Sequence, residues 1–355
     1  ETAAALVARA QRGRELRRTP AQRRADLLAE IELAVDECLR KGVTSFQDAG
    51  SSFGTVDVFR ELAERGELGV RLWVMIREDD RTLEEKVADY RLVGAGDHFL
   101  TVRALKRSID GALGSRGAWL LEPYSDAPDS SGLETASVES VTRMAELGLR
   151  HGFQVCVHAI GDRANREVLD LYEKVWGGRD GRALRWRIEH AQHLHPDDVP
   201  RFGGLGVIAS MQGVHCTSDA PYVVQRLGEQ RAREGAYVWQ DLLRTGAVVT
   251  NGTDAPVEDV DPIASFHASV TRRTKSGEAF HPEQAMSRME ALRSYTIDCA
   301  FAAFEEDLKG TLTPGKLADV VVLSKDILTV PDDEILEARV LYTIVGGKVV
   351  FDASR

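Results

Sequence analysis

The sequence predicts an α/β protein, with a TIM-type (β/α)8 barrel and a small C-terminal β-sandwich element. Short β-branched runs alternate with amphipathic helical segments along most of the chain, and 355 residues suit one barrel with a small addition. After residue 311 the pattern changes to short apolar runs separated by glycines. We therefore expect a barrel domain over residues 1–311 and a β-sandwich portion over residues 312–355.

Seven runs of the chain have the pattern of parallel strands. Each is short, rich in β-branched residues, and separated from the next by a loop or a helical pattern. They span Val43–Asp48, Val70–Ile76, Thr101–Ile109, Gln154–Ala159, Trp186–His190, Val207–Met211 and Ala247–Thr250. Helical patterns cover the stretch through about Arg40, Val56–Arg65, Val138–Arg150, Asn165–Val175, Val238–Arg244, Pro262–Arg273 and Arg288–Phe304.

A closed barrel needs eight strands, so this count predicts that strand one is absent from the chain. The sequence opens with ETAAALVARAQRGRELRR, without Met and as if in the middle of a helix. We expect an upstream segment that carries strand one and half of the β-sandwich. The alternative is a version of the protein that has lost both.

The C-terminal β element is predicted from three apolar runs. Val340–Val345 and Lys348–Phe351 flank the pair Gly346-Gly347, an arrangement typical of a tight β-hairpin. Val320–Leu323 supplies the third run. Because the hairpin has a free edge, pairing with a second copy to form a homodimer is left open.

The net charge, the apolar runs and the cysteine spacing indicate which partners and which compartment the protein is suited to. The chain has 45 Lys and Arg against 56 Asp and Glu, a formal charge of −11 that opposes binding to nucleic acid or anionic membranes. No apolar run reaches the roughly 18 residues that span a bilayer, and the start lacks a signal-peptide core. The four cysteines form no CxxC pair, which favours reduced thiols and a cytoplasmic protein.

The ends of the predicted strands carry residues suited to metal binding or proton transfer. In a barrel these ends converge on one open face, where functional side chains gather. Taken singly, each residue has a structural explanation: a histidine can be hydrogen-bonded in the core, an aspartate can cap a turn, and a lysine can extend to the surface. Their occurrence at successive strand ends favours one shared site, formed by Lys106, His158, His190, His215 and Asp254.

Five motifs resemble the amidohydrolase superfamily, and more narrowly its amidohydrolase-3 branch, the YtcJ-like proteins. The resemblance covers essentially the whole chain in collinear order. The motifs are DGALGSRGAWLLEPYSD (110–126), VHAIGDRA (157–164), RIEHAQHLHPDD (187–198), GTDAPV (252–257) and GTLTPGKLADVVVL (310–323).

The resemblance implies a metal-dependent hydrolase that drives water onto a carbon–nitrogen bond of a small non-peptide amide, an N-acyl or N-formyl amine. It implies one or two divalent ions, of the zinc type, although N/O ligands also admit iron, manganese or nickel. Lys106 corresponds to the family's bridging lysine, often carboxylated, and His158 and His190 to its histidine ligands. Asp254 corresponds to the aspartate that binds metal and shuttles protons.

These implied roles are chemically consistent. A desolvated lysine near cations favours its neutral amine, which can take up carbon dioxide and become an anionic oxygen ligand. Neutral imidazoles bind zinc without adding charge, so a bound water is acidified to a pKa near 7. Asp254 would accept a proton from that water and deliver it to the departing amine.

Four further residues are assigned supporting roles, and two of these roles have an alternative. His215 resembles a substrate-contacting position and could hold the carbonyl oxygen, or it could belong to the core or a loop. Arg116 could meet an anionic substrate group or make a loop contact. Asp110 and Asp162 are expected to orient ligands and backbone around a metal site.

One departure from the family pattern concerns its opening motif, a His-x-His at the end of strand one. The chain has no such motif before Val43, and its single His-x-His, His193-Leu194-His195, precedes Pro196 in a loop that enters a helix. We interpret that pair as structural; the alternative is that it replaces the missing ligands.

The missing ligands suggest a competing hypothesis, in which the chain is a non-catalytic small-molecule-binding protein or an inactive fragment. A third keeps the enzyme but changes the bond, to lactone opening or ring deamination.

Overall fold

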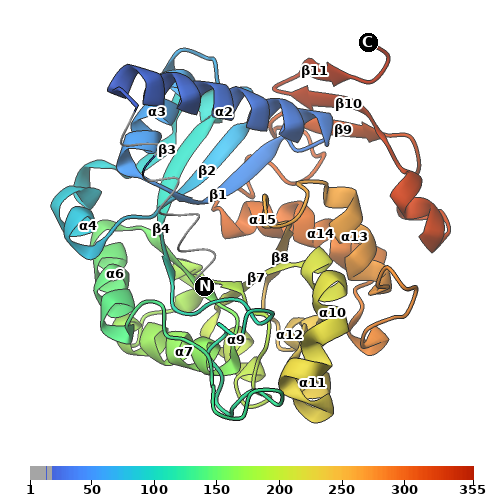
Figure 1. The fold of residues 1–355 in the computed structure, drawn as a ribbon. Helices are drawn as coiled ribbons and strands as arrows, with labels where there is room; N and C mark the ends of the chain where they lie inside the picture. The colour runs from blue at the N-terminus through green and yellow to red at the C-terminus, as the bar shows by residue number, and fades with distance from the viewer. Residues whose placement is uncertain (1–12, 14–17) are drawn as a thin grey trace.

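The computed structural model describes residue 13 and residues 18–355. Seven parallel strands pair side by side in the order β1-β2-β4-β5-β6-β7-β8 and form a curled sheet (Figure 1). These are the seven strands predicted from the sequence, and the TIM-type barrel class is confirmed. The strands span β1 (Ser45–Ser51), β2 (Arg71–Ile76), β4 (Leu100–Ser108), β5 (Gln154–Ala159), β6 (Arg187–His190), β7 (Ile208–Gln212) and β8 (Val249–Gly252).

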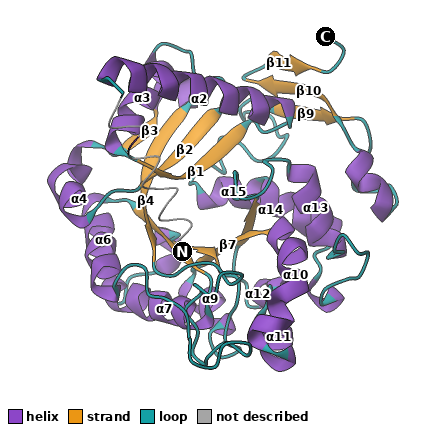
Figure 2. Ribbon diagram, viewed as in Figure 1, coloured by secondary structure: helices purple, strands orange, loops and turns teal. Residues whose placement is uncertain are grey.

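Helices cover the outside of this curled sheet (Figure 2). They are α2 (Pro20–Arg40), α3 (Phe53–Glu64), α4 (Asp80–Lys86), α5 (Ala95–His98), α6 (Val138–His151), α7 (Asp162–Trp176), α8 (Gly181–Leu184), α9 (Val199–Leu205), α10 (Gly213–Leu227), α11 (Glu229–Gly235), α12 (Trp239–Arg244), α13 (Pro262–Thr271), α14 (Arg288–Tyr295) and α15 (Ile297–Ala302), with short 3-10 turns at Val87–Asp89, Pro282–Gln284 and Asp332–Glu337. Within the described ranges no helix is long and apolar enough to cross a membrane.

Several elements differ from the prediction, among them helix α10 and several short helices that were not predicted. The short strand β3 (Leu92–Gly94) pairs antiparallel with β4 and was not predicted. The helix predicted over Arg288–Phe304 is two helices, because the backbone at Thr296 is not helical (φ −120°, ψ −93°). His215, predicted at a strand end, lies in the first turn of α10, since β7 stops at Gln212.

The sheet is open on one side. In the part of the chain that the structure describes, β1 pairs only with β2, and β8 pairs only with β7. The backbone edges of β1 and β8 that face this opening therefore carry no strand partner among the described residues. This is the place in the barrel where the sequence predicted a missing strand.

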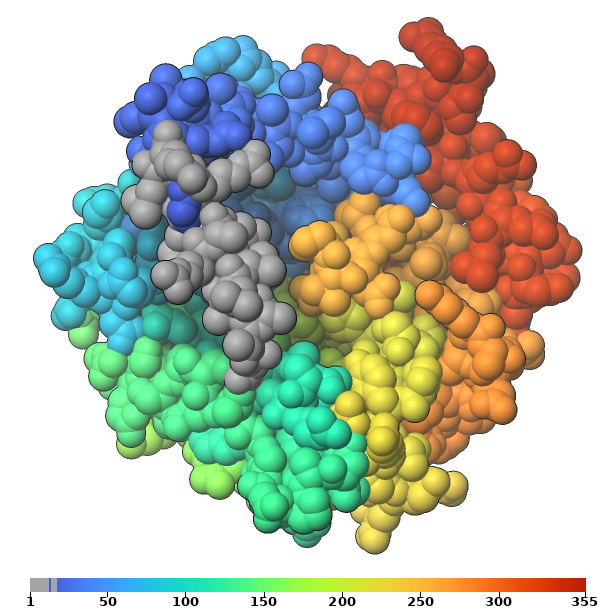
Figure 3. All heavy atoms as spheres, in the orientation of Figure 1, coloured from blue at the N-terminus to red at the C-terminus, as the bar shows by residue number. Residues whose placement is uncertain are grey.

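A separate antiparallel sheet lies at the C-terminus. It contains β9 (Val320–Leu323), β10 (Val340–Val345) and β11 (Lys348–Asp352) in the order β11-β10-β9, and forms one side of the molecule (Figure 3). The hairpin turn between β10 and β11 needs two glycines, because Gly346 and Gly347 both have positive φ (56° and 76°). The predicted hairpin is confirmed, while a domain boundary at residue 312 stays a prediction.

The C-terminal sheet is attached to the amino-terminal side of the barrel. Val345 packs against Cys38 and Leu39 of α2. A buried ion pair joins Arg71, at the start of β2, to Asp319, with Nε 2.7 Å from Oδ2. These contacts leave the carboxyl ends of the barrel strands free to form a site.

Candidate metal centre

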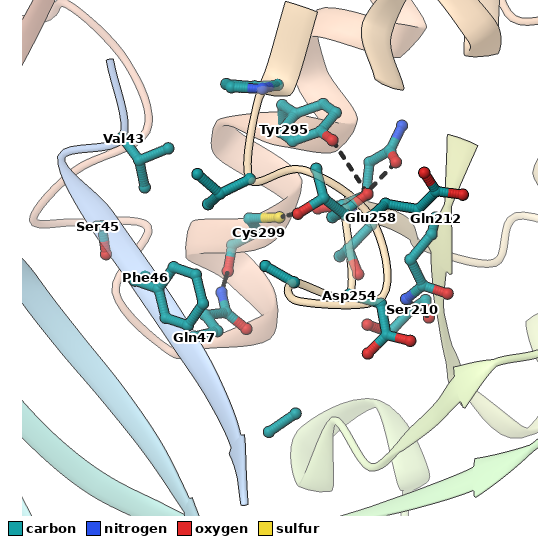
Figure 4. A pocket seen from close by; sticks show the side chains of 18 of the residues that line it. Val43, Ser45, Phe46, Gln47, Ser210, Gln212, Asp254, Glu258, Tyr295 and Cys299 are labelled. Carbon is teal, nitrogen blue, oxygen red and sulfur yellow. Dashed lines mark hydrogen bonds between the residues drawn. The ribbon is translucent and has the colours of Figure 1, made fainter. Parts of the chain in front are cut away.

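A cavity of about 1420 Å³ opens at the carboxyl ends of the barrel strands and continues into the gap between β1 and β8. In Figure 4, Phe46 and Gln47 of β1 lie on one side of this cavity, and Ser210, Gln212 and Asp254 lie on the other. Its wall also includes four more of the residues singled out from the sequence: Lys106, His158, His190 and His215.

Three side chains approach one another as the ligands of a single ion would. His190 at the end of β6, His215 in α10 and Asp254 after β8 each offer a ligand atom within 4.8 Å of the others. Nε2 of His215 is 3.9 Å from Oδ2 of Asp254, and the two imidazole rings stack with centroids 6.0 Å apart. Ligands of one tetrahedral zinc ion lie roughly 3.5 Å from each other, so small side-chain rotations would complete such a site.

An unsatisfied polar atom supports a cation at this position. Nε2 of His215 is buried and has no hydrogen-bond partner, which is costly unless another group binds it. Nδ1 of His190 instead donates to Oε1 of Gln212 at 2.6 Å. This bond fixes the tautomer and leaves Nε2 of His190 as a lone-pair donor.

The backbone places His190 and Asp254 in the cavity through a left-handed conformation. Successive residues of a regular strand point to opposite faces, yet Glu189 and His190 both line the cavity. The positive φ of His190 (77°) and Ala191 (44°) breaks the strand pattern and permits this. Asp254 also has positive φ (57°). Such conformations cost about 1–3 kcal/mol each in non-glycine residues and concentrate at functional sites.

Lys106 and His158 extend the cluster along β4 and β5. The His158 and His190 rings meet edge to face with centroids 4.4 Å apart. Burial lowers the pKa of Lys106 to about 8, so its neutral amine is accessible near neutral pH. Burial, with the positive charges of Lys106 and Arg77, lowers the pKa of His158 to about 3. At neutral pH His158 is therefore in the uncharged form that binds metal, and a minor fraction of Lys106 is the neutral amine that can take up carbon dioxide.

Asp110 and Asp162 lie behind the cavity wall and hold loops. Asp110 accepts hydrogen bonds from the backbone N–H groups of Trp119 (2.9 Å), Ile160 (3.0 Å) and Gly161 (2.8 Å). Its Oδ1 is also 3.4 Å from Nε2 of His158. Burial raises the pKa of Asp110 to about 7. Asp110 thus links the loop after β4 to the loop after β5 that follows His158.

Asp162, the first residue of α7, accepts from the backbone N–H of Leu121 at 2.9 Å. It ties the loop after β4 to that helix.

Arg116 and the two histidines of the His-x-His motif also lie outside the cavity wall. Arg116 forms a two-pronged ion pair with Asp126, at 3.1 and 2.9 Å. His193 is buried against Tyr237, and His195 lies 3.5 Å from Asp197. None of Arg116, His193 and His195 is among the residues that line the cavity.

An ion pair in the barrel interior was missed in the sequence. Arg187 and Glu189 of β6 both line the cavity and pair at 2.8 Å, while the Arg187 guanidinium also contacts Gln47 of β1. The sequence does contain a signal for this pair: two charged residues at a spacing of two in a buried strand share one face of the sheet. In a barrel strand that face is the interior.

The fold and the site together define a class, a barrel protein with a histidine and aspartate cluster at the carboxyl ends of its strands. Within that class, the sequence model of the Amidohydrolase family matches residues 1–351, and the chain belongs to this family. The resemblance drawn from the motifs is confirmed.

Known relatives agree with this membership. The chain is 36% identical over 344 residues to Protein LONG AFTER FAR-RED 3 of Arabidopsis thaliana, covering 90% of this chain and 58% of that protein. It is 29% identical over 332 residues to putative amidohydrolase YtcJ of Bacillus subtilis (strain 168), covering 91% and 61%. The crystal structure of an uncharacterized metal-dependent hydrolase from Pyrococcus horikoshii OT3 superposes with a TM-score of 0.76 at 30% identity, over 87% of this chain and 62% of that one. The chain thus spans about three-fifths of the length of these relatives.

Proposed function

We propose that this chain forms the barrel of a metal-dependent hydrolase that cleaves a carbon–nitrogen bond in a small non-peptide amide, an N-acyl or N-formyl amine. The approach of His190, His215 and Asp254 to within 4.8 Å of one another carries this proposal. Membership of the amidohydrolase family supports it.

The residues that would hold metal fall into two groups. His190, His215 and Asp254 would hold one ion, which makes His215 a ligand instead of the substrate contact predicted from the sequence. Lys106, after carboxylation, and His158 would hold a second ion. A divalent ion in this site, zinc or a metal of similar ligand preference, would acidify a bound water and polarise a carbonyl group.

Asp254 is suited to move the proton. Its side chain is one-third exposed (33%), with Oδ2 directed toward His215, so it contacts both the cluster and the space open to substrate. It would accept a proton from the attacking water and pass it to the leaving amine. Gln212 would keep His190 in the tautomer that leaves its Nε2 free.

The opening between β1 and β8 favours a second candidate function. The cavity runs into this opening, and no residue within the described ranges supplies a His-x-His pair to it. A chain that stays open there would be a non-catalytic small-molecule-binding protein. We propose instead that a parallel strand from a longer form of the protein fills the gap and carries the His-x-His expected from the family pattern.

Metal content and turnover of the full-length natural protein test the proposed function. We expect one or two ions per chain and hydrolysis within a panel of N-formyl and N-acyl amines. Asp254→Asn should lower kcat by at least roughly 10²-fold, as expected for loss of a general acid–base group, while metal content stays near that of the natural protein. Asp259→Asn, on the same loop but 61% exposed, is the matched control and should leave turnover within twofold.

Unchanged turnover in Asp254→Asn would remove Asp254 from the mechanism. A full-length protein with no bound metal and no turnover would favour the binding protein.

A further inference from the structure

Arg77 occupies the same interior layer of the barrel as Lys106. In the pairing of β2 with β4, Met75 lies opposite Ala104 and Ile76 opposite Leu105. The next register position places Arg77, directly after β2, beside Lys106. Met75 and Ala104 are both part of the interior cluster of the barrel, so alternation turns Arg77 toward the interior as well. Arg77 lines the central cavity.

The stem of Arg77 is held in place by close packing on β1. A Cβ atom at Gly50 would lie 2.9 Å from Cδ and 3.1 Å from Cβ of Arg77, so the absent side chain of Gly50 makes room for the arginine stem. The Arg77 backbone N–H donates to the Ser51 carbonyl at 2.9 Å. With its stem confined, Arg77 can deliver its guanidinium to a restricted part of the cavity mouth.

The Arg77 guanidinium makes no ion pair with the residues that the structure describes. Its one hydrogen bond to the described part of the chain, from Nη2 to Oγ of Ser108, is long at 3.4 Å. Among residues 18–355, no carboxylate lies within ion-pair distance of Arg77. Among the described residues, the other arginines that line this cavity, Arg187 and Arg293, are paired with Glu189 (2.7 Å) and Asp298 (3.1 Å).

Arg77 adds a positive charge to the β2 side of the cavity wall. Arg77 stands on the β2 side, close enough to Lys106 and His158 that its charge, after the larger effect of burial, helps to lower the pKa of both groups. Asp219 and Glu258 line the cavity from other elements, and Asp48 of β1, whose pKa is raised by burial, lines it from the strand next to β2. An anion that enters this cavity meets in Arg77 a cation without a carboxylate partner among residues 18–355, in a chain whose formal net charge is −11.

We propose that Arg77 binds an anionic group of the substrate, and that the substrates are N-acyl or N-formyl amines bearing a carboxylate, such as N-acyl amino acids. A guanidinium matches a carboxylate through two parallel hydrogen bonds. Arg116, which the sequence suggested for this role, is already engaged by Asp126. The hydrolytic part of this inference rests on the proposed function, whereas the anion-binding part does not.

The test compares acids with their neutral counterparts in the full-length, metal-loaded protein. A panel of N-formyl and N-acetyl amino acids is paired with the corresponding primary amides, which lack the negative charge. Arg77→Met should raise KM for the acids at least tenfold with kcat changed less than threefold, and leave KM for the amides within twofold. Arg77→Lys, which keeps the charge but loses the planar fork, should give an intermediate KM. Arg81→Met is the control for loss of one positive charge, because its side chain is 87% exposed.

Equilibrium binding of the same panel by calorimetry separates this inference from the proposed function. If nothing is hydrolysed, the proposed function fails, but tighter binding of acids than of amides that disappears in Arg77→Met still supports the anion site. The inference is overturned if the natural protein shows no preference for acids in turnover or binding. It is also overturned if Arg77→Met loses metal or affects acids and amides equally, because Arg77 would then act through Lys106.

Discussion

At the scale of single residues, the barrel interior depends on the buried pair of Arg187 and Glu189. Their side chains are 2% and 7% exposed. Burial alone would raise the pKa of Glu189, but the charges of Arg187 and Lys106 hold it below its usual value, so it stays ionised. The guanidinium also lies 5.1 Å from the centre of the Trp73 ring. Each charge is tolerated in the interior because the other is present.

Glu189→Gln should therefore lower the free energy of unfolding by about 3–5 kcal/mol, because it leaves the Arg187 charge buried without a counter-ion. Urea denaturation of the metal-free protein measures this directly. The matched control is Glu85→Gln, which breaks an exposed pair with Arg81 and should cost under about 0.5 kcal/mol. Equal midpoints for the two variants would show that Arg187 does not depend on Glu189.

Single residues also show how far the site could be predicted. Lys106, His158 and Asp254 stand at strand ends, and the order of these ends along the chain was enough to predict that they share a cavity. The left-handed turn at His190 has no such signal, since strand periodicity alone would point His190 and Glu189 to opposite faces. Arg77 was missed because its exposure to the cavity depends on pairing register and on the space at Gly50.

At the scale of elements, the turn between β7 and α10 sets the position of His215. The Gly213 N–H donates to Oδ1 of Asn251 at 2.9 Å, and Nδ2 of Asn251 donates to Oγ of Ser269 at 2.9 Å. A Cβ at Gly213 would lie 2.1 Å from that hydroxyl and 2.6 Å from the Ser265 carbonyl oxygen. The turn is therefore clamped between β8 and α13, which keeps His215 close to Asp254.

Gly213→Ala should displace this turn, lower the free energy of unfolding by about 1–3 kcal/mol and weaken metal binding at least tenfold, since overpacking must shift either α10 or α13. Metal titration and urea denaturation of the same sample measure both effects. Gly204→Ala is the matched control, because a Cβ there meets no atom within 4 Å and alanine suits the α9 helix. A Gly213→Ala variant with normal metal affinity would show that the turn does not position His215.

The element boundaries explain which parts of the fold were predictable. Parallel strands buried on both faces, such as β2 and β4, produce apolar runs that local sequence reveals, and all seven strands were found. Helix α10 was not predicted, because Pro221 and several β-branched residues interrupt its helical pattern. The break between helices α14 and α15 at Thr296 and the three-residue strand β3 are set by contacts with other elements, which local sequence does not reveal.

At the scale of the whole molecule, the curled sheet brings four strand-end residues from positions 106 to 254, together with His215 of α10, into one cavity. The C-terminal sheet stabilises the opposite side, through α2 and through the Arg71–Asp319 pair. The cavity reaches from the carboxyl ends of the strands to this junction, because Asp319 and residues of β9 also line it. The opening between β1 and β8 is the one part of the barrel circumference without strand pairing among the described residues.

The central claim is that the side chains of His190, His215 and Asp254 bind one metal ion. Crystals of the full-length protein grown with zinc, with diffraction recorded on both sides of the zinc absorption edge, locate every bound zinc ion. We predict an anomalous peak about 2.0–2.2 Å from a nitrogen of each histidine and from an oxygen of Asp254. Zinc bound only elsewhere, with these three side chains more than about 4 Å from any ion, would contradict the account.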